Sequence, residues 1–142
     1  MSIKNLLFRQ LVDKILSHSV ELISVDKAHQ EHSNFMFLDA REKSEYDVSH
    51  IEKAIHVGYK DFDIMSLDSI SKNKPIIVYC SVGYRSEKIA EILLKNGFQD
   101  IRNLYGGIFE WANNSLTLVN TEGTTSAIHP YNSTWKVWIN KD

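Results

Sequence analysis

The stretch Lys74–Gly97, KPIIVYCSVGYRSEKIAEILLKNG, joins an apolar run to an amphipathic segment through a short loop that holds the chain's single cysteine, Cys80. The apolar run over residues 75–80 predicts a buried strand. Apolar residues at helical spacing, ended by Gly97, predict a helix over residues 85–97. A strand, a tight loop and a helix in this order form the repeating unit of a parallel α/β sheet.

The same alternation of strands and helices continues on both sides of this stretch, from about residue 22 to residue 113. Short apolar runs predict strands, and the segments between them predict helices, the first of which has Asp26 as its candidate N-terminal cap. This order predicts an α/β domain with a mainly parallel sheet. The predicted strands are residues 21–25, 35–40, 53–58, 75–80 and 100–104, and the predicted helices are residues 26–32, 41–50, 64–71, 85–97 and 108–114.

Both ends of the chain lie outside the alternating region. Residues 3–18 have an apolar stripe at helical spacing, which predicts a helix that packs on the domain or, as the alternative, binds a partner. Residues 115–142 have no clear period but contain large apolar side chains, which we expect to be buried on the domain rather than to dock a partner. The expected segments are an N-terminal helix in residues 1–20, the α/β domain in residues 21–114 and a C-terminal extension in residues 115–142. The helix stripe is Leu6, Leu7, Leu11, Ile15 and Leu16, and the extension carries Tyr131, Trp135, Val137, Trp138 and Ile139.

Composition excludes several classes of function. A chain of 142 residues that is 43% hydrophobic and 24% charged is typical of one soluble globular domain. The net charge of −2 gives no electrostatic basis for binding nucleic acid or an anionic membrane. No apolar run approaches the roughly 20 residues that span a bilayer, and the N-terminus lacks the apolar centre of a signal peptide. With one cysteine and no internal disulfide, we predict a cytoplasmic protein without nucleic-acid or membrane partners, and its oligomeric state stays open.

The loop after Cys80 has the composition of an anion-binding loop. Parallel sheets bind ligands at the carboxyl ends of their strands, which is where Cys80 lies. Gly83 permits a turn that points backbone N–H groups inward, and the next helix adds the positive end of its dipole. Arg85 adds a full positive charge, and Ser86 can cap the helix or donate a hydrogen bond. These features favour a nucleophilic thiolate at Cys80, with a buried structural cysteine as the alternative.

Two stretches of the sequence resemble the single-domain rhodaneses, or thiosulfate sulfurtransferases. FLDAREKSEYDVSHIEKAIHVGY, residues 37–59, is similar to the family's Asp-x-Arg-Glu, Glu-Tyr and His-Ile-x-x-Ala pattern. Residues 74–111 are similar to the active-site loop, its helix and the closing Leu-x-Gly-Gly-x-x-x-Trp motif. The resemblance implies a three-layer α/β domain with a mainly parallel five-stranded sheet flanked by helices. The first pattern falls on Asp39, Arg41, Glu42, Glu45, Tyr46, His50, Ile51 and Ala54.

The resemblance implies a sulfurtransferase in which Cys80 accepts sulfur from thiosulfate or a related donor and holds it as a persulfide. A thiol or cyanide then removes this sulfur, in covalent ping-pong chemistry that uses no cofactor and no metal. The loop amides stabilise the anionic sulfur, and Arg85 orients the sulfite-like part of the donor. The substrate-binding residues are then Ser81, Val82, Gly83, Tyr84, Arg85 and Ser86.

Two residues of the loop depart from the family pattern. Ser81 stands where many members carry Arg, and the missing charge weakens the case for thiosulfate as the physiological donor. Tyr84 is bulky and narrows access to the loop. Two other functions remain alternatives: a non-catalytic rhodanese-like binding or regulatory module, and a cysteine-dependent phosphatase or arsenate reductase. The enzymes of the second class place a longer loop between Cys and Arg than the four residues found here.

Asp39 and Arg41 follow a predicted strand at the same sheet edge as Cys80. They can form an ion pair that shapes the rim of the active site, with a buried structural pair as the alternative. His29 and His32 are three residues apart on a predicted helix, but no further ligands at suitable spacing accompany them, so we predict no metal site.

Overall fold

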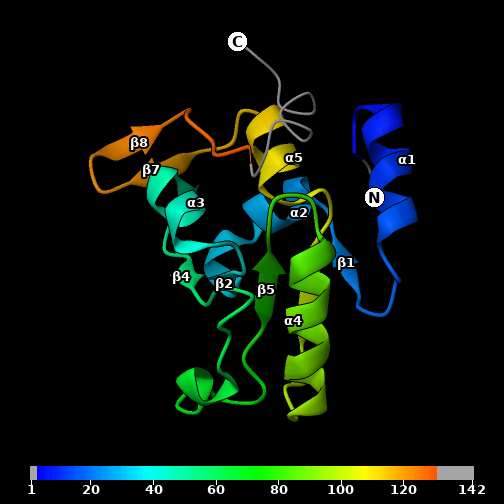
Figure 1. The fold of residues 1–142 in the computed structure, drawn as a ribbon, viewed down its shortest axis with the longest axis vertical. Coiled ribbons are helices and arrows are strands. Elements are labelled where there is room, and N and C mark those ends of the chain that lie inside the picture. The colour runs from blue at the N-terminus through cyan, green and yellow to red at the C-terminus, as the bar shows by residue number, and fades with distance from the viewer. Residues whose placement is uncertain (1–2, 131–142) are drawn as a thin grey trace.

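The computed structural model describes residues 3–130, whose centre is a five-stranded parallel sheet (Figure 1). Every pair of neighbouring strands in this sheet is parallel, with Val78 of the central strand opposite both Leu38 and Asn103. The predicted parallel five-stranded sheet is therefore confirmed. The strands, in spatial order, are β1 (Leu22–Ile23), β6 (Ile101–Leu104), β5 (Ile76–Tyr79), β2 (Met36–Asp39) and β4 (Ile55–His56).

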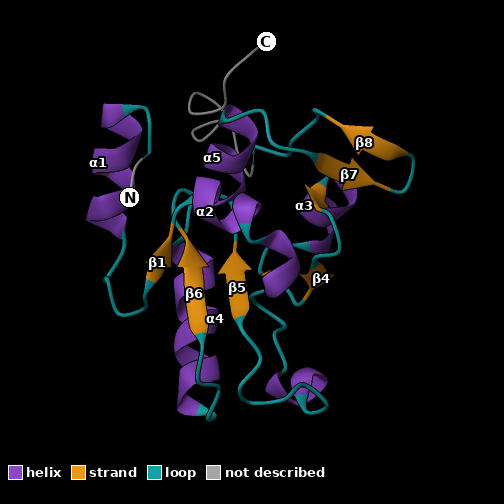
Figure 2. Cartoon of the chain, turned by 180° about the vertical axis from the view of Figure 1, so that it is seen from behind, coloured by secondary structure: helices purple, strands orange, loops and turns teal. Residues whose placement is uncertain are grey.

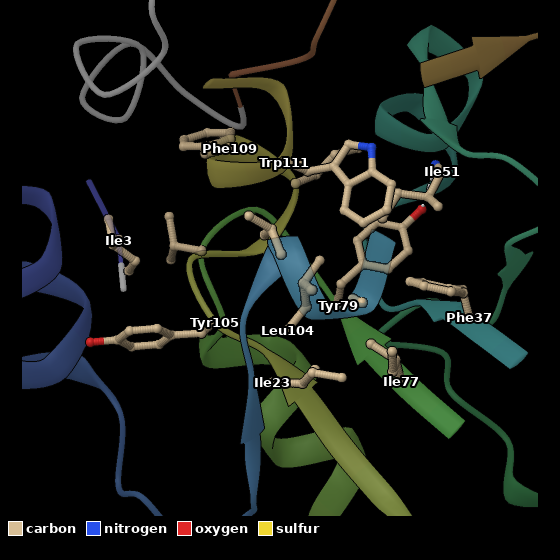
Figure 3. Packing of buried hydrophobic residues seen from close by; sticks show 14 of the residues in the cluster. Ile3, Ile23, Phe37, Ile51, Ile77, Tyr79, Leu104, Tyr105, Phe109 and Trp111 are labelled. Carbon is tan, nitrogen blue, oxygen red and sulfur yellow. Dashed lines mark hydrogen bonds between the residues drawn. The ribbon is translucent and has the colours of Figure 1, made fainter. Parts of the chain in front are cut away.

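Side chains of β5 alternate between two hydrophobic clusters, one on each face of the sheet. Ile77 and Tyr79 belong to the cluster that includes residues of α1 (Leu6–Ile15), α2 (Val25–Gln30) and α5 (Gly107–Asn113), part of which is drawn in Figure 3. Ile76 and Val78 belong to the cluster covered by α4 (Tyr84–Lys95). Figure 2 shows α4 behind the sheet, which gives the three layers. Burial of both strand faces explains why the sequence shows an uninterrupted apolar run.

Several predicted elements are shorter than the sequence pattern indicated. The predicted helices over residues 41–50 and 64–71 are α3 (Lys43–Val48) and a 3-10 helix (Ile64–Leu67). The predicted cap Asp26 is wrong: α2 is capped by Ser24, whose Oγ accepts a hydrogen bond from Lys27 N at 3.2 Å. Asp26 instead lies in the first turn, where its charge suits the helix dipole. A further 3-10 helix is His32–Asn34.

The face of α1 that packs on the domain differs from the predicted stripe. Phe8, Val12 and Leu16 are buried, at a spacing of four residues, whereas Leu6 and Leu7 are 54% and 66% exposed. Of the predicted stripe, Leu16 is buried and Leu11 and Ile15 are half-buried, whereas Phe8 and Val12 were not included in it. No helix within residues 3–130 is long and apolar enough to cross a membrane.

A second sheet was not predicted from the sequence. It is antiparallel and consists of β3 (His50–Ile51), β7 (Leu118–Asn120) and β8 (Gly123–Thr125). Asn120 fixes the turn by accepting a hydrogen bond from Glu122 N, and its Nδ2 donates to Val48 O. Part of the expected C-terminal extension is thus tied to the α/β domain. The boundaries at residues 20 and 114 stay predictions, and Tyr131, Trp135, Val137, Trp138 and Ile139 lie outside the described residues.

The connection from α1 to β1 is held by a buried carboxylate on α4. Glu87 Oε1 and Oε2 accept hydrogen bonds from Ser17 N at 2.8 Å and from His18 N at 2.9 Å. We expect Glu87→Gln, which keeps one acceptor and turns an amide donor toward the other N–H, to lower the free energy of unfolding by about 1–3 kcal/mol. Glu52→Gln, at an exposed glutamate in the turn between β3 and β4, is the control in urea unfolding. Equal effects of the two variants would contradict this role of Glu87.

Candidate active site

Cys80 directly follows β5, and its sulfur is buried against the start of α4. Gly83 N donates a hydrogen bond to Cys80 Sγ at 3.1 Å, and Ser86 Oγ lies 3.4 Å from the sulfur. Gly83 has a φ of 135° and caps α4, so the loop needs the conformational freedom of glycine there. Because α4 begins at Tyr84, the loop is tight and the positive end of the helix dipole lies close to the sulfur. The Gly83 N–H and the start of α4 therefore both lie at the Cys80 sulfur.

Arg85 is paired with Glu45 of α3 and is almost fully buried. Arg85 Nη1 and Nη2 donate to Glu45 Oε2 at 2.8 Å and Oε1 at 3.0 Å, and Nη2 also donates to Ser81 Oγ at 2.9 Å. Burial alone would raise the pKa of Glu45, but the hydrogen bond and charge of Arg85 outweigh it and lower the pKa. Arg85 therefore joins the loop to α3, and donor orientation by its guanidinium stays a prediction.

Asn103 of β6 completes a network beneath the loop. Its Nδ2 donates to Gly83 O at 3.0 Å, and its Oδ1 accepts from Ser86 Oγ at 2.6 Å. Asn103 and Ser86 have no exposed surface. Both groups that contact the Cys80 sulfur are thus bonded to one side-chain amide on a neighbouring strand.

Helix α5 supports the loop from the other side. Ile108 N donates to Cys80 O at 2.9 Å, and Phe109 N donates to Ser81 O at 3.1 Å. Gly107 has a φ of 61°, and a Cβ built on it would lie 2.4 Å from Ser81 O. The loop backbone is therefore in direct contact with the first turn of α5.

Asp39 and Arg41 form the predicted ion pair, but neither has any exposed surface. Arg41 Nη2 donates to Asp39 Oδ2 at 2.8 Å and to Ser49 O at 2.6 Å. Burial lowers the pKa of Arg41, but the charge and hydrogen bond of Asp39 outweigh it, so the pKa is raised overall. This burial fits a structural pair, and a role of Asp39 and Arg41 in shaping the active-site rim stays a prediction.

Tyr84 is the most exposed of the loop residues, at 44%, whereas Ser81 and Val82 are buried. Lys88 Nζ lies 5.5 Å from the centroid of the Tyr84 ring, so a cation accompanies this aromatic side chain.

The two histidines considered as metal ligands make other contacts: His29 lies edge-on to Trp111, and His32 stacks on Phe37. Residues 3–130 contain no cluster of three or more His, Cys, Asp or Glu side chains placed to hold a metal ion.

Of the predicted loop residues, the structure places Gly83 and Ser86 against the Cys80 sulfur. It also adds two residues, Glu45 and Asn103, that the sequence analysis did not assign to the site. Glu45 belonged to the quoted family pattern, but nothing in its spacing identified Arg85 as its partner. Asn103 is one of two polar residues in the short strand β6, near its carboxyl end and beside the strand that leads to Cys80. A polar residue at that position of a parallel sheet is a signal that could have identified it.

Comparisons with known proteins agree with this architecture. The family profile "Rhodanese-like domain" matches residues 24–114. A tRNA uridine(34) hydroxylase from Photorhabdus laumondii is 32% identical over 103 residues, which cover 68% of this chain and 29% of that protein. One from Yersinia pestis is 39% identical over 82 residues, which cover 54% of this chain and 23% of that protein. The chain thus spans less than a third of the length of these relatives.

Solved structures share the fold at low sequence identity. The BH2092 protein from Bacillus halodurans has a TM-score of 0.71 and 20% identity, and the match covers 92% of this chain and 96% of that chain. A thiosulfate sulfurtransferase from Pseudomonas aeruginosa has a TM-score of 0.66 and 20% identity, covering 87% of this chain and 24% of that chain. The profile match covers more than half of the chain, so this chain belongs to the family of rhodanese-like domains.

Proposed function

We propose that this protein is a sulfurtransferase that carries sulfane sulfur as a persulfide on Cys80. The observation that carries the proposal is the buried Cys80 sulfur, which accepts a hydrogen bond from Gly83 N at 3.1 Å in a tight loop at the start of α4. Backbone donors and a helix N-terminus at a cysteine sulfur stabilise the thiolate, the form that attacks sulfur.

The proposed reaction has two balanced steps, with thiosulfate as the test donor. The Cys80 thiolate attacks the outer sulfur of thiosulfate, a new S–S bond forms, and the S–S bond of thiosulfate breaks with release of sulfite. Cys80 then holds an anionic persulfide. Cyanide or a thiolate attacks the terminal sulfur and takes it, and the Cys80 thiolate is regenerated.

The surrounding residues support this chemistry by fixing the conformation of the Cys80 loop. Gly83 N–H and the Ser86 hydroxyl are the donors next to the sulfur. The ion pair of Arg85 with Glu45 fixes the position of Ser81 through its hydroxyl. The Gly83 N–H is fixed in place before reaction, and such a donor stabilises charge on the transferring sulfur without reorganisation.

Intact mass before and after incubation with thiosulfate tests the proposal. We expect the wild type to gain one sulfur atom, and cyanide to remove it as thiocyanate. Cys80→Ala, which lacks the only cysteine in the sequence, is expected to gain nothing. If neither thiosulfate nor small-molecule persulfides load the wild type, the sulfurtransferase proposal is overturned. An aryl phosphate assay then tests the phosphatase alternative, and inactivity there favours a binding module.

A contribution to tRNA modification is the second candidate function. It is favoured by the 39% identity to tRNA uridine(34) hydroxylases over 82 residues. The net charge of −2 opposes it, because RNA binding draws most of its affinity from cationic contacts to phosphates. A gel-shift assay with total tRNA at low salt decides the point. Absence of a complex would remove this candidate for the chain tested alone.

A further inference from the structure

We infer that Asn103 is a positioning residue for the Cys80 loop, because its side-chain amide holds in place the two groups that contact the nucleophilic sulfur. This inference rests on the proposed function and goes beyond it, since Asn103 lies on β6 and outside the loop. Four residues, Cys80, Gly83, Ser86 and Asn103, form a closed ring of hydrogen-bonding contacts.

One side of the ring fixes Gly83. The N–H of this residue donates to Cys80 Sγ at 3.1 Å, while its carbonyl accepts from Asn103 Nδ2 at 3.0 Å. Glycine is the least restricted residue in any backbone, so a bond to its carbonyl limits how far its own N–H can turn away. Asn103 thereby keeps the Gly83 N–H directed at the sulfur.

The other side of the ring fixes Ser86. Its hydroxyl has one hydrogen and three acceptors in reach: Asn103 Oδ1 at 2.6 Å, Gly83 O at 3.2 Å and Cys80 Sγ at 3.4 Å. The Gly83 carbonyl can only accept, so Asn103 must present Nδ2 to it and Oδ1 to Ser86. Ser86 Oγ is therefore anchored next to the sulfur. When the sulfur becomes negative, rotation of the hydroxyl turns its single hydrogen from Asn103 Oδ1 to Cys80 Sγ, so the second hydrogen bond to the sulfur replaces the bond to Asn103.

Because the network is buried, its members can bond only to one another and not to bulk water. Asn103 and Ser86 have no exposed surface, so bulk water does not replace a lost partner. A buried polar network whose members are all bonded holds one geometry, whereas a partly broken one rearranges. Loss of the Asn103 amide is therefore expected to disorder both donors to the sulfur at once, while loss of the Ser86 hydroxyl removes one donor only.

The test is a pH titration of the Cys80 thiolate, followed by its ultraviolet absorbance in the full chain with Cys80→Ala as the blank. We expect Asn103→Ala to move the midpoint upward by about one pH unit, which is a tenfold loss of thiolate at a fixed pH below it. Ser86→Ala is expected to give a smaller upward shift. The double variant is expected to match Asn103→Ala, because both donors depend on the same amide.

Asn103→Leu, which fills the same space without hydrogen bonds, replaces Asn103→Ala if that variant does not fold. Leu67→Ala is the control for simple destabilisation, since Leu67 is buried in the 3-10 helix Ile64–Leu67, at the opposite end of the sheet from the loop (Figure 1). Its titration is expected to match the wild type.

The positioning role would be overturned by an unchanged midpoint in the Asn103 variant, by a downward shift, or by shifts of Asn103→Ala and Ser86→Ala that simply add. A shift of similar size in Leu67→Ala would also overturn it. The titration uses no sulfur donor, so its outcome is independent of whether thiosulfate loads Cys80. Failure of this inference is thus distinguishable from failure of the proposed function.

Discussion

Glu45→Ala is expected to lower the free energy of unfolding by about 3–5 kcal/mol and to prevent sulfur loading of Cys80. Glu45 is buried and makes a two-pronged ion pair with Arg85, at 2.8 and 3.0 Å, while its Oε2 also accepts from Glu42 N at the start of α3. Removing the carboxylate leaves a buried guanidinium poorly compensated and weakens the N-terminus of α3. Urea unfolding and intact mass after thiosulfate measure the two effects.

Glu45→Gln isolates the charge, because an amide oxygen can still accept from Glu42 N. The pKa of Glu45 is lowered in the folded protein, since Arg85 outweighs the opposing effect of burial. A lowered pKa in the folded state contributes stability above the ordinary glutamate value of about 4.3, and this stability is lost as the pH falls toward the folded value. We therefore expect Glu45→Gln to lower the free energy of unfolding at neutral pH. We also expect the free energy of unfolding of this variant to change less with pH below about 4.3 than that of the wild type.

Asp47→Ala is the matched control on the same helix. Asp47 pairs with Lys43, but both side chains are more than half exposed. Exposed pairs contribute little, so a change within about 0.5 kcal/mol and normal sulfur loading are expected. If Glu45→Ala behaves like Asp47→Ala, the buried pair does not organise the Cys80 loop.

The sequence was sufficient to predict the parallel sheet and the cysteine loop because both depend on local order. A strand that is buried on both faces shows an uninterrupted apolar run, as in residues 75–80, and a helix shows its stripe, as in residues 85–97. A tight loop joins this strand to this helix, so Cys80 lies at the carboxyl edge of the sheet independently of how the rest of the chain packs. Ser81, Gly83, Arg85 and Ser86 follow from the same placement.

The partners of these residues are set by packing between distant segments, which a single sequence does not specify. Glu45 is 40 residues from Arg85, and Asn103 is 20 residues from Gly83. From the sequence, an arginine five residues after a cysteine is interpreted as a side chain that binds an anionic substrate. Only the position of α3 in the structure shows that the carboxylate of Glu45 already pairs with it. The antiparallel sheet was missed for a related reason: its strands have two or three residues, too few to show a period of two.

Gly107→Ala is expected to destabilise the protein by at least about 3 kcal/mol and to abolish sulfur loading, because the loop and α5 leave no room for a methyl group. A Cβ on Gly107 would lie 2.4 Å from Ser81 O and 2.5 Å from Cys80 O. These atoms are backbone, and they also accept the hydrogen bonds from Phe109 N and Ile108 N. Relief of the clash therefore requires the loop to move off α5, which carries the Cys80 sulfur away from its donors.

Gly97→Ala separates this clash from backbone strain. Gly97 also has a positive φ, 92°, but a Cβ there meets no atom within 4 Å. It follows α4 at the end distant from Cys80, so the substitution is expected to cost about 1 kcal/mol of conformational strain and to leave sulfur loading intact. Thermal unfolding and intact mass compare the two variants. Equal destabilisation, or normal loading of Gly107→Ala, would show that the loop does not depend on its contact with α5.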